Sequence, residues 1–405
     1  MANVPPQKLL ILSNGHGEDQ VAVRIVRSLQ NLSHPPEIKA LSIVGEGHAY
    51  QRQQIPLLDA VQAMPSGGFI YMDSRQTLRD IKGGLGQLTR RQLREVRAWA
   101  KQGGKILAVG DIVPLLFAWW SGAKYAFVGT AKSDYYLRDD RGEPIPRVGH
   151  PWWLSASVYL PWERWLMQRS QCCAVFPRDP LTAQILKQYA IPVFDQGNPM
   201  MDDLQPSGHL DLSTIYIQPQ RTVLLLPGSR APEVYANWEV ILDAIAFLLH
   251  PTQPQLFLGA LAPGLDHAPL SHALQQRGWQ SQMNQERWTQ AGSRLLLTGD
   301  FNDCLRRVEV AIAMAGTATE QCVGLGLPVI TIPGQGPQFT AAFAEAQARL
   351  LGASIFRVEH PTQVADIMAH IDSADLQPWQ ANGLRRMGQP GAAQRIAETL
   401  AAELL

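Results

Sequence analysis

The sequence is poor in charge, and this shortage already excludes several classes of protein. Charged residues make up 17% of the 405 residues and apolar residues 46%, which excludes a largely disordered chain and indicates extensive burial. The 35 basic and 35 acidic residues cancel, so no overall positive field is available to hold nucleic acid. At about 150 residues per domain, the length predicts two or three domains.

Cysteine and several short catalytic motifs are also scarce or absent. None of the 4 cysteines has the spacing of a zinc site or a CxxC redox centre, so we expect buried, reduced thiols. The sequence has no Asp-x-Asp, which argues against a metal-dependent single-domain glycosyltransferase. It has neither a GxxxxGK[ST] phosphate loop nor a nucleophile elbow, which excludes P-loop NTPases and serine hydrolases. We therefore expect no metal and no other cofactor.

No segment reads as a secretory signal or a membrane span. Residues 1–7 lack a basic region followed by an apolar core. The most apolar stretch, Lys105–Ala123, contains Asp111 and Pro114 and falls short of the ~20 uninterrupted residues that cross a bilayer. We therefore expect a cytoplasmic protein in which this stretch forms a buried strand and then a helix. The sequence does not indicate an oligomeric state.

Apolar runs alternate with segments of helical period, as in parallel strands joined by helices, so the predicted class is α/β. The expected strands are 9–12, 38–44, 106–109, 125–128, 173–176, 193–196, 222–226, 255–258, 294–297, 310–314 and 329–332. The expected helices are 19–30, 89–101, 236–249, 317–324, 341–350 and 394–404.

A polar segment with two prolines, residues 204–220, separates two series of strands and is the expected hinge. We predict an N-terminal Rossmann-like domain over 1–204 and a C-terminal one over 205–405, facing each other across a cleft. In such folds the last helix is expected to pack back on the first domain. Ligands bind at the carboxyl ends of the strands of open α/β sheets, so candidate residues were sought there.

The first strand runs directly into a glycine-rich loop, Ser13–Asp19, and then a helix. Its glycines, Gly15 and Gly17, allow a tight turn and close approach of a ligand, which Asn14 and the helix N-terminus can contact. His16 and Glu18 can act there as acid or base. The alternative is an ordinary loop in which Asp19 caps the helix.

Two later strands also end in small-residue turns. Leu224–Leu226 is followed by Pro227-Gly228-Ser229-Arg230, where a fixed cation can bind a diphosphate. Val310–Met314 is followed by a turn that opens a helix able to hold phosphate, with an acidic residue within reach of ribose hydroxyls. The alternatives are a surface turn and a capped structural helix. The second turn and its helix supply Gly316, Thr317, Ala318, Thr319, Glu320 and Gln321.

Asp111 follows the strand 106–109 inside an apolar stretch and is a candidate general base for a hydroxyl. The equally weighted alternative is a carboxylate that caps the helix beginning near Pro114.

A basic segment, Ser74–Lys101, carries eight basic and two acidic residues on an otherwise neutral chain. The apolar Gly67–Met72 precedes it, and tryptophans follow it at 119, 120, 152, 153, 162 and 165. Such a combination can dock on an anionic membrane and receive a lipid-linked substrate. The alternative is a solvated helix face with core tryptophans.

Taken together, these motifs resemble lipid-A-disaccharide synthase, an inverting glycosyltransferase of the GT-B fold, and the group called lipid-A-disaccharide synthase-related proteins. The resemblance covers nearly the whole chain. It is carried by the glycine-rich first loop, Val109-Gly110-Asp111, Phe176-Pro177, Gln196–Asp202, Leu226–Arg230 with Glu233, and Gly316-Thr317-Ala318.

The resemblance implies a UDP-sugar donor bound by the C-terminal domain, through Arg230 and Thr317–Gln321, and a lipid-linked acceptor bound by the N-terminal domain. Three departures bear on the site. Gly15 stands where the synthase has a glutamate, and Asp111 stands where it has two aspartates around a proline. The acidic residue of the nucleotide helix aligns with Gln321, while Glu320 lies one position, about 100° of helix, earlier.

The leading hypothesis is an inverting glycosyltransferase that moves a sugar from a UDP-GlcNAc-like donor to a lipid-linked acceptor, peripheral on the cytoplasmic face of the inner membrane. Asp111 is the proposed base, with His16 as second candidate. A UDP-sugar epimerase or hydrolase of the same fold is the second hypothesis. A non-catalytic lipid- or partner-binding homologue is the third.

Overall fold

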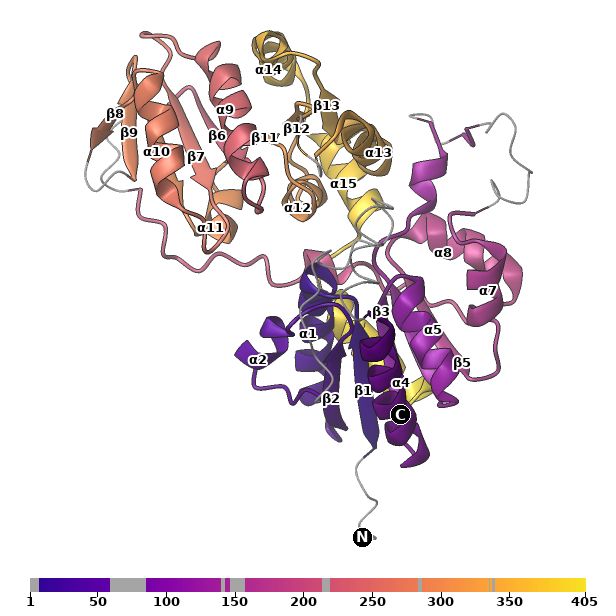
Figure 1. Cartoon of the computed structure of the whole chain (residues 1–405). Coiled ribbons are helices and arrows are strands. Elements are labelled where there is room, and N and C mark those ends of the chain that lie inside the picture. The colour runs from indigo at the N-terminus through magenta and orange to yellow at the C-terminus, as the bar shows by residue number, and fades with distance from the viewer. Residues whose placement is uncertain are drawn as a thin grey trace. The chain divides into compact units, whose positions relative to one another are not determined.

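The computed structural model describes residues 7–58, 85–139, 143–145, 157–212, 219–282, 286–334, 336 and 339–405. The chain divides into two compact units (Figure 1). Unit 1 comprises Met1–Leu137, Pro144–Asp202 and Gly388–Leu405, and unit 2 comprises Arg138–Glu143 and Asp203–Met387. The Gly67–Met72 segment lies outside the described residues, as do Arg75, Arg79 and Lys82 of the basic segment and Trp152 and Trp153.

Unit 1 is built on a parallel sheet of order β2-β1-β3-β4-β5. Its strands are β1 Lys8–Ser13, β2 Glu37–Ser42, β3 Lys105–Gly110, β4 Tyr125–Gly129 and β5 Cys172–Pro177. Its helices are α1 His16–Gln30, α2 His48–Arg52, α4 Leu85–Lys101, α5 Ile112–Ser121, α7 Pro161–Met167, α8 Pro180–Leu186 and α16 Ala392–Glu403.

Successive residues of β1 point to opposite faces of this sheet, and each face has its own core. Leu9 and Ile11 pack with α1 and α16 on one face. Leu10 and Leu12 pack with α4 and α5 on the other. A buried residue at every position of the strand interior explains why these strands appear in the sequence as unbroken apolar runs.

The last helix belongs to unit 1, and the Gln196–Asp202 motif holds it there. The Asp202 carboxylate accepts hydrogen bonds from the backbone N–H groups of Gly391, Ala392 and Ala393, at 2.5 to 3.2 Å, and so caps α16. The Gln196 amide donates to Thr399 at 2.8 Å. The Gln196–Asp202 motif, which the family resemblance pointed to, therefore fastens α16 to unit 1.

Unit 2 is built on a mixed sheet of order β13-β12-β11-β6-β7-β10-β9-β8, parallel from β13 to β10 and antiparallel beyond it. Its strands are β6 Arg221–Leu226, β7 Gln255–Ala260, β8 Gln280–Gln282, β9 Arg287–Gln290, β10 Ser293–Thr298, β11 Val310–Ala313, β12 Val329–Thr331 and β13 Ile355–Arg357. Its helices are α9 Glu233–Ala246, α10 His267–Gln276, α11 Phe301–Leu305, α12 Thr317–Gly324, α13 Ala341–Leu351, α14 Val364–Ser373 and α15 Gln377–Met387.

One expected strand is wrong. In the segment 193–196 only Val193 pairs, through an isolated bridge to Val175. The chain then reaches Gly197 at φ +84°, where it turns away toward α16. A single bridge followed by a left-handed turn cannot extend the sheet.

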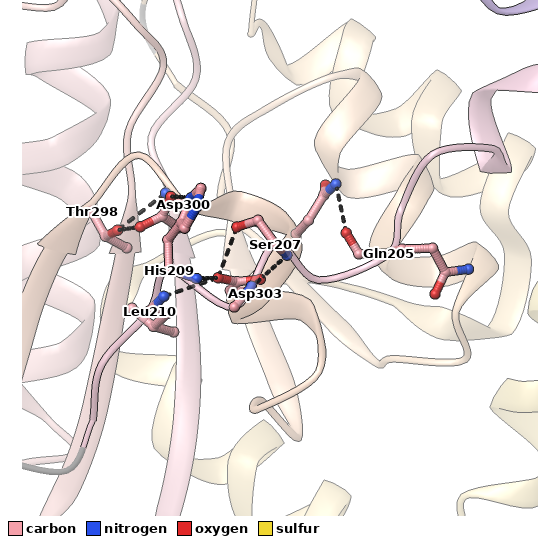
Figure 2. A network of polar contacts seen from close by, with 9 residues as sticks. Gln205, Ser207, His209, Leu210, Thr298, Asp300 and Asp303 are labelled. Atoms are coloured by element: carbon pink, nitrogen blue, oxygen red, sulfur yellow. Dashed lines mark hydrogen bonds and ion pairs between the residues drawn. The ribbon is translucent and has the colours of Figure 1, made fainter.

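The first part of the expected hinge is fastened to unit 2 by Asp303 at α11 (Figure 2). Its carboxylate accepts from the backbone N–H groups of Ser207, Gly208, His209 and Leu210, and from the Ser207 hydroxyl at 3.0 Å. Burial alone would raise the pKa of Asp303, but these hydrogen bonds outweigh it and hold that pKa well below its ordinary value.

Replacing Asp303 with asparagine should therefore lower the free energy of unfolding of unit 2 at neutral pH. Because the folded-state pKa is depressed, the carboxylate stabilises the fold above the unfolded pKa of about 3.9, and this stabilisation is lost as pH falls below it. The difference between wild type and Asp303→Asn should be full above about pH 5 and shrink below about pH 4. Urea unfolding at several pH values measures it.

The matched control is Asp300→Asn, which removes a neighbouring carboxylate that accepts a hydrogen bond from the Thr298 hydroxyl at 3.2 Å (Figure 2). Equal losses at pH 7 and pH 3 in Asp303→Asn would contradict the electrostatic account of this anchor.

Candidate functional site

In unit 1 the candidate residues lie at the switch point of the sheet. From β1 the chain forms β2 on one side of β1 and then crosses to form β3 on the other side, and ligands of open α/β sheets bind at such a switch point. Gly110, at φ +134°, ends β3 so close to the β1 loop that an added Cβ would lie 3.3 Å from Glu18 Cγ and 3.4 Å from the Asn14 amide. The structure thus brings Asn14, Glu18 and the Gly110–Asp111 turn together.

The loop between β1 and α1 requires glycine. Gly15 has φ +142°, and a Cβ there would lie 2.8 Å from the carbonyl oxygen of Val44. The helix begins at His16, whose side chain is not described, and its N-cap residue is Gly15, which has no side chain to cap it. Gly17 is exposed and Glu18 half-buried. Asn14 is buried, and its Oδ1 accepts no hydrogen bond within the described part of the chain, which leaves an acceptor at the strand end.

Asp19 is not the helix cap that one alternative predicted. It is buried, and its carboxylate accepts from Ser13 at 2.5 Å and from Ser42 at 3.1 Å. Ser13 in turn shares a 2.6 Å hydrogen bond with the Tyr50 hydroxyl. Burial and the negative charge of Asp19 raise the pKa of Tyr50, so the phenol stays neutral. This network links the ends of β1 and β2 to α1, and so fixes the base of the loop between β1 and α1.

Asp111 caps a helix, as the alternative to catalysis predicted. Its Oδ1 accepts from the backbone N–H of Val113 at 2.8 Å and caps α5. The residue is half-buried. Its Oδ2 makes no hydrogen bond within the described residues and lies on a side chain fixed by the cap. A carboxylate held by one oxygen can still use the other as a base.

In unit 2 the switch point lies between β6 and β11, and three strand ends meet there. Gly228, at φ +104°, would place a Cβ 3.2 Å from the carbonyl oxygen of Met314. Buried Asn237 of α9 donates to Pro227 at 2.9 Å and to Met314 at 3.5 Å. An added Cβ on Gly334, which follows β12, would lie 2.9 Å from Oδ1 of Asn237. Asn237 therefore ties β6 and β11 together beside the loop that follows β12.

Glu233, at the start of α9, holds the loop after β12 against the turn that carries Arg230. Its Oε1 accepts from the backbone N–H of Phe339 at 2.6 Å, and Gly336 packs so close to its carboxylate that no Cβ would fit. Ser229 is exposed, while Gly228 and Arg230 are half-buried. The turn is thus fixed at its base, with an arginine on it.

Helix α12 has the bounds that the sequence predicted, and its N-cap residue is Gly316, which has no side chain to cap it. The carbonyl oxygen of Ala315 accepts from the Thr319 hydroxyl at 2.7 Å and from the Gln347 amide at 3.0 Å. Thr317 is exposed and Ala318 half-buried, whereas Thr319, Glu320 and Gln321 are buried. The Thr319 side chain is therefore used within the turn.

Sequence reasoning missed Asn237, Gln347 and the Ser13–Ser42–Tyr50 partners of Asp19. The available signal for Asn237 was a polar residue on the otherwise apolar face of the helix predicted over 236–249. The others are brought in from elements far along the chain, which no local pattern indicates.

The unit 2 arrangement suits an anion. A helix N-terminus carries partial positive charge and N–H groups that have no partner within the helix, and an arginine adds a fixed cation. The unit 1 arrangement instead offers two carboxyl groups, those of Asp111 and half-buried Glu18, for acid–base catalysis, and the Asn14 amide for hydrogen bonding.

The described residues include no group of three His, Cys, Asp or Glu side chains able to hold a metal ion. All four cysteines are free. Burial raises the pKa of Cys172 and of Cys304 to about 12, so these thiols stay protonated and unreactive. Within the described part of the chain, no helix is both long enough and apolar enough to cross a membrane.

No protein-family model matches the chain. Its sequence is 26% identical over 232 residues to lipid-A-disaccharide synthase from Syntrophus aciditrophicus (strain SB). The match covers 55% of this chain and 55% of that protein, so the chain spans about half the length of this curated relative. This similarity confirms the resemblance drawn from the motifs.

Solved structures resemble the chain over nearly its whole length. CalG4, the calicheamicin glycosyltransferase, superposes with a TM-score of 0.60 at 13% identity, and the match covers 99% of this chain and 99% of CalG4. The chain has the GT-B fold. UDP-GlcNAc 2-epimerase from Neisseria meningitidis, bound to UDP-GlcNAc, scores 0.56 at 14% identity, covering 98% of this chain and all (100%) of that one. MurG from Acinetobacter baumannii scores 0.55 at 13% identity with the same coverage.

The GT-B fold thus confirms the predicted class of two Rossmann-like domains. It is shared by glycosyltransferases and epimerases, and a shared fold does not choose between their reactions.

Proposed function

We propose that this protein is an inverting glycosyltransferase that uses a UDP-sugar, of the UDP-GlcNAc type, and a lipid-linked acceptor. The observation that carries the proposal is that Gly228, Arg230 and the N-terminus of α12 all follow strand ends at the β6/β11 switch point, where Asn237 fixes the turns. This set matches a diphosphate in charge and in hydrogen-bond donors. The similarity to lipid-A-disaccharide synthase supports the choice of a sugar donor and lipid acceptor.

The reaction we propose needs no metal. Asp111 removes the proton from the acceptor hydroxyl, and the oxygen attacks the anomeric carbon as the bond from that carbon to the diphosphate oxygen breaks. UDP leaves with the bonding electron pair, and its added negative charge is stabilised by Arg230 and the helix end at Gly316. His16 is the second candidate for the base, and Glu18 is a further acid or base at the same loop.

The deciding experiment is calorimetric titration with UDP and a panel of UDP- and other nucleotide-linked sugars. We expect UDP and one UDP-sugar to bind and other nucleotides to bind weakly. No affinity of the folded protein for any nucleotide would overturn the enzymatic proposal and favour a non-catalytic lipid- or partner-binding protein.

A second candidate, a UDP-sugar epimerase or hydrolase, is favoured by one observation, the similarity to UDP-GlcNAc 2-epimerase over 98% of this chain. Incubation with UDP-GlcNAc without an acceptor separates the reactions. An epimerase converts the donor to its epimer and a hydrolase releases free sugar, whereas a transferase leaves most of it intact until a glycolipid acceptor is added. NMR spectra of the sugar anomeric protons distinguish these outcomes.

We place the reaction at the cytoplasmic face of the inner membrane, because a lipid-linked acceptor is held in a bilayer while nucleotide sugars are water-soluble.

A further inference from the structure

Unit 1 exposes a group of tryptophans on α5 and α7, two helices that pack against each other. Trp120 is 43% exposed, Trp162 52% and Trp165 42%. Half-buried Trp119 lies edge-on to Trp165, with ring centroids 5.3 Å apart, and 6.3 Å from Trp120. Trp162 and Trp165 are three residues apart on one helix, so their side chains lie on the same face. We call these four side chains the tryptophan surface.

These tryptophans are not the core residues that one alternative predicted. Of the six large apolar side chains that are most exposed among the described residues, three belong to the tryptophan surface. Tryptophans elsewhere, such as Trp238 and Trp288, are fully buried. Adjacent exposed aromatic side chains on a soluble unit are typical of an interaction site rather than of a bare surface.

Positive charge borders this surface. Arg97 Nε donates to the Trp120 carbonyl at 3.1 Å. Arg169 Nε donates to the Trp165 carbonyl at 2.9 Å, and its guanidinium lies 4.0 Å from the ring centroid. The only acidic residue of α7, Glu163, is buried and paired with Lys132.

Helix α4, which packs beside α5, adds further basic side chains. Its exposed charged residues are Arg90, Arg91, Arg94, Arg97 and Lys101, against the single acid Glu95. On a chain whose 35 basic and 35 acidic residues cancel, this is a local concentration of positive charge.

We propose that the tryptophan surface docks on an anionic lipid bilayer, with its indole rings at the headgroup level and the arginines of α4 against lipid phosphates. Tryptophan has an apolar body and a polar N–H, which suits it to the membrane–water interface. The basic residues of α4 supply the electrostatic attraction to anionic lipids that a few aromatic side chains alone do not. A symmetric dimer through this surface would instead bring two positively charged borders together.

This inference rests on the proposed function in one respect, because the lipid-linked acceptor is what makes contact with a membrane necessary. The tryptophan surface on α5 and α7 and the basic side chains of α4 all belong to unit 1, whereas the proposed nucleotide site belongs to unit 2, so membrane docking and UDP binding can be tested separately.

The test is flotation of the full chain with lipid vesicles that contain neither donor nor acceptor. Vesicles of phosphatidylcholine are compared with vesicles containing phosphatidylglycerol. We expect binding to the anionic vesicles, weakened by high salt, and a loss of at least ~10-fold in partitioning for both Trp120→Ser/Trp162→Ser and Arg94→Gln/Lys101→Gln. The matched control is Phe247→Ser, which removes an apolar side chain of unit 2 that is also 52% exposed, and should bind as wild type does.

UDP titration of each variant shows that it is folded and that the nucleotide site is intact. Equal flotation of wild type and both double variants would overturn the proposal, as would failure of the wild type to bind anionic vesicles. Concentration-dependent self-association that the tryptophan variant loses, without vesicle binding, would assign the surface to a second copy of the chain. A protein that binds vesicles but not UDP would uphold this inference while contradicting the proposed function.

Discussion

Arg230→Ala should weaken UDP binding about 10- to 100-fold and leave the fold intact. Hydrogen bonds to a charged group contribute about 1.5–3 kcal/mol each, and every 1.4 kcal/mol is a factor of ten in affinity. Arg230 lies on the turn that follows β6, whose base is already fixed by Asn237 and by the Glu233–Phe339 hydrogen bond of 2.6 Å. Calorimetric titration with UDP measures the loss.

Two further variants separate a specific diphosphate contact from a change of net charge. Arg307→Ala removes the same charge from an exposed position of unit 2 and should bind UDP as wild type does. Arg230→Lys keeps the charge but not the planar fork that pairs with two oxygens, and should recover part of the affinity. If Arg230→Ala and Arg307→Ala behave alike, Arg230 does not contact the diphosphate.

The sequence predicted the fold well wherever burial dictates the residue pattern. Both faces of each central strand are covered, so β1, β3, β6 and β11 appear as apolar runs that no alternating surface strand would give. The bounds of α12 were predicted correctly because glycines flank it, Gly316 at its start and Gly326, at φ +83°, just after it.

One strand escaped prediction because it has no buried face. All three residues of β8, Gln280–Gln282, are exposed and polar, so no hydrophobic period marks them as a strand. Val193–Gln196 shows the opposite failure, because its apolar residues face the β5 edge but pair with it only once. Local composition does not determine over how many residues a segment pairs with the adjacent strand.

The candidate site could be predicted at the level of loops but not of contacts. Parallel strands bring their carboxyl ends to one edge, so the sequence could predict that the residues after β1 and β3 lie together in unit 1, and those after β6 and β11 in unit 2. Which side chains fix those loops depends on elements distant in sequence. Asn237 lies on a helix, yet it donates to carbonyls after β6 and β11. Gln347 reaches the Ala315 carbonyl from α13.

Asp111→Asn should lower turnover about 10²- to 10⁴-fold, the usual contribution of a general base, while UDP affinity stays unchanged. The substitution is well suited to the geometry, because asparagine caps helices about as well as aspartate. The hydrogen bond from Val113 to Oδ1, 2.8 Å in the wild type, can therefore persist. What is lost is the ability of the other oxygen to take a proton. Initial rates of UDP release in the presence of acceptor measure turnover, and calorimetry measures donor binding.

Asp111→Ala provides the comparison that separates capping from catalysis. It removes the cap as well as the base, so it should lose turnover to a similar extent and in addition lose about 1 kcal/mol of stability. Normal turnover in Asp111→Asn would leave Asp111 as a helix cap alone. The base would then be sought at the β1 loop, which Gly110 brings against Asn14 and Glu18, and His16→Gln would be the next variant to assay. Asp111 and Arg230 lie in different units. Asp111→Asn should therefore change the rate of the chemical step alone, whereas Arg230→Ala should lower both the affinity for UDP and the rate at which UDP leaves.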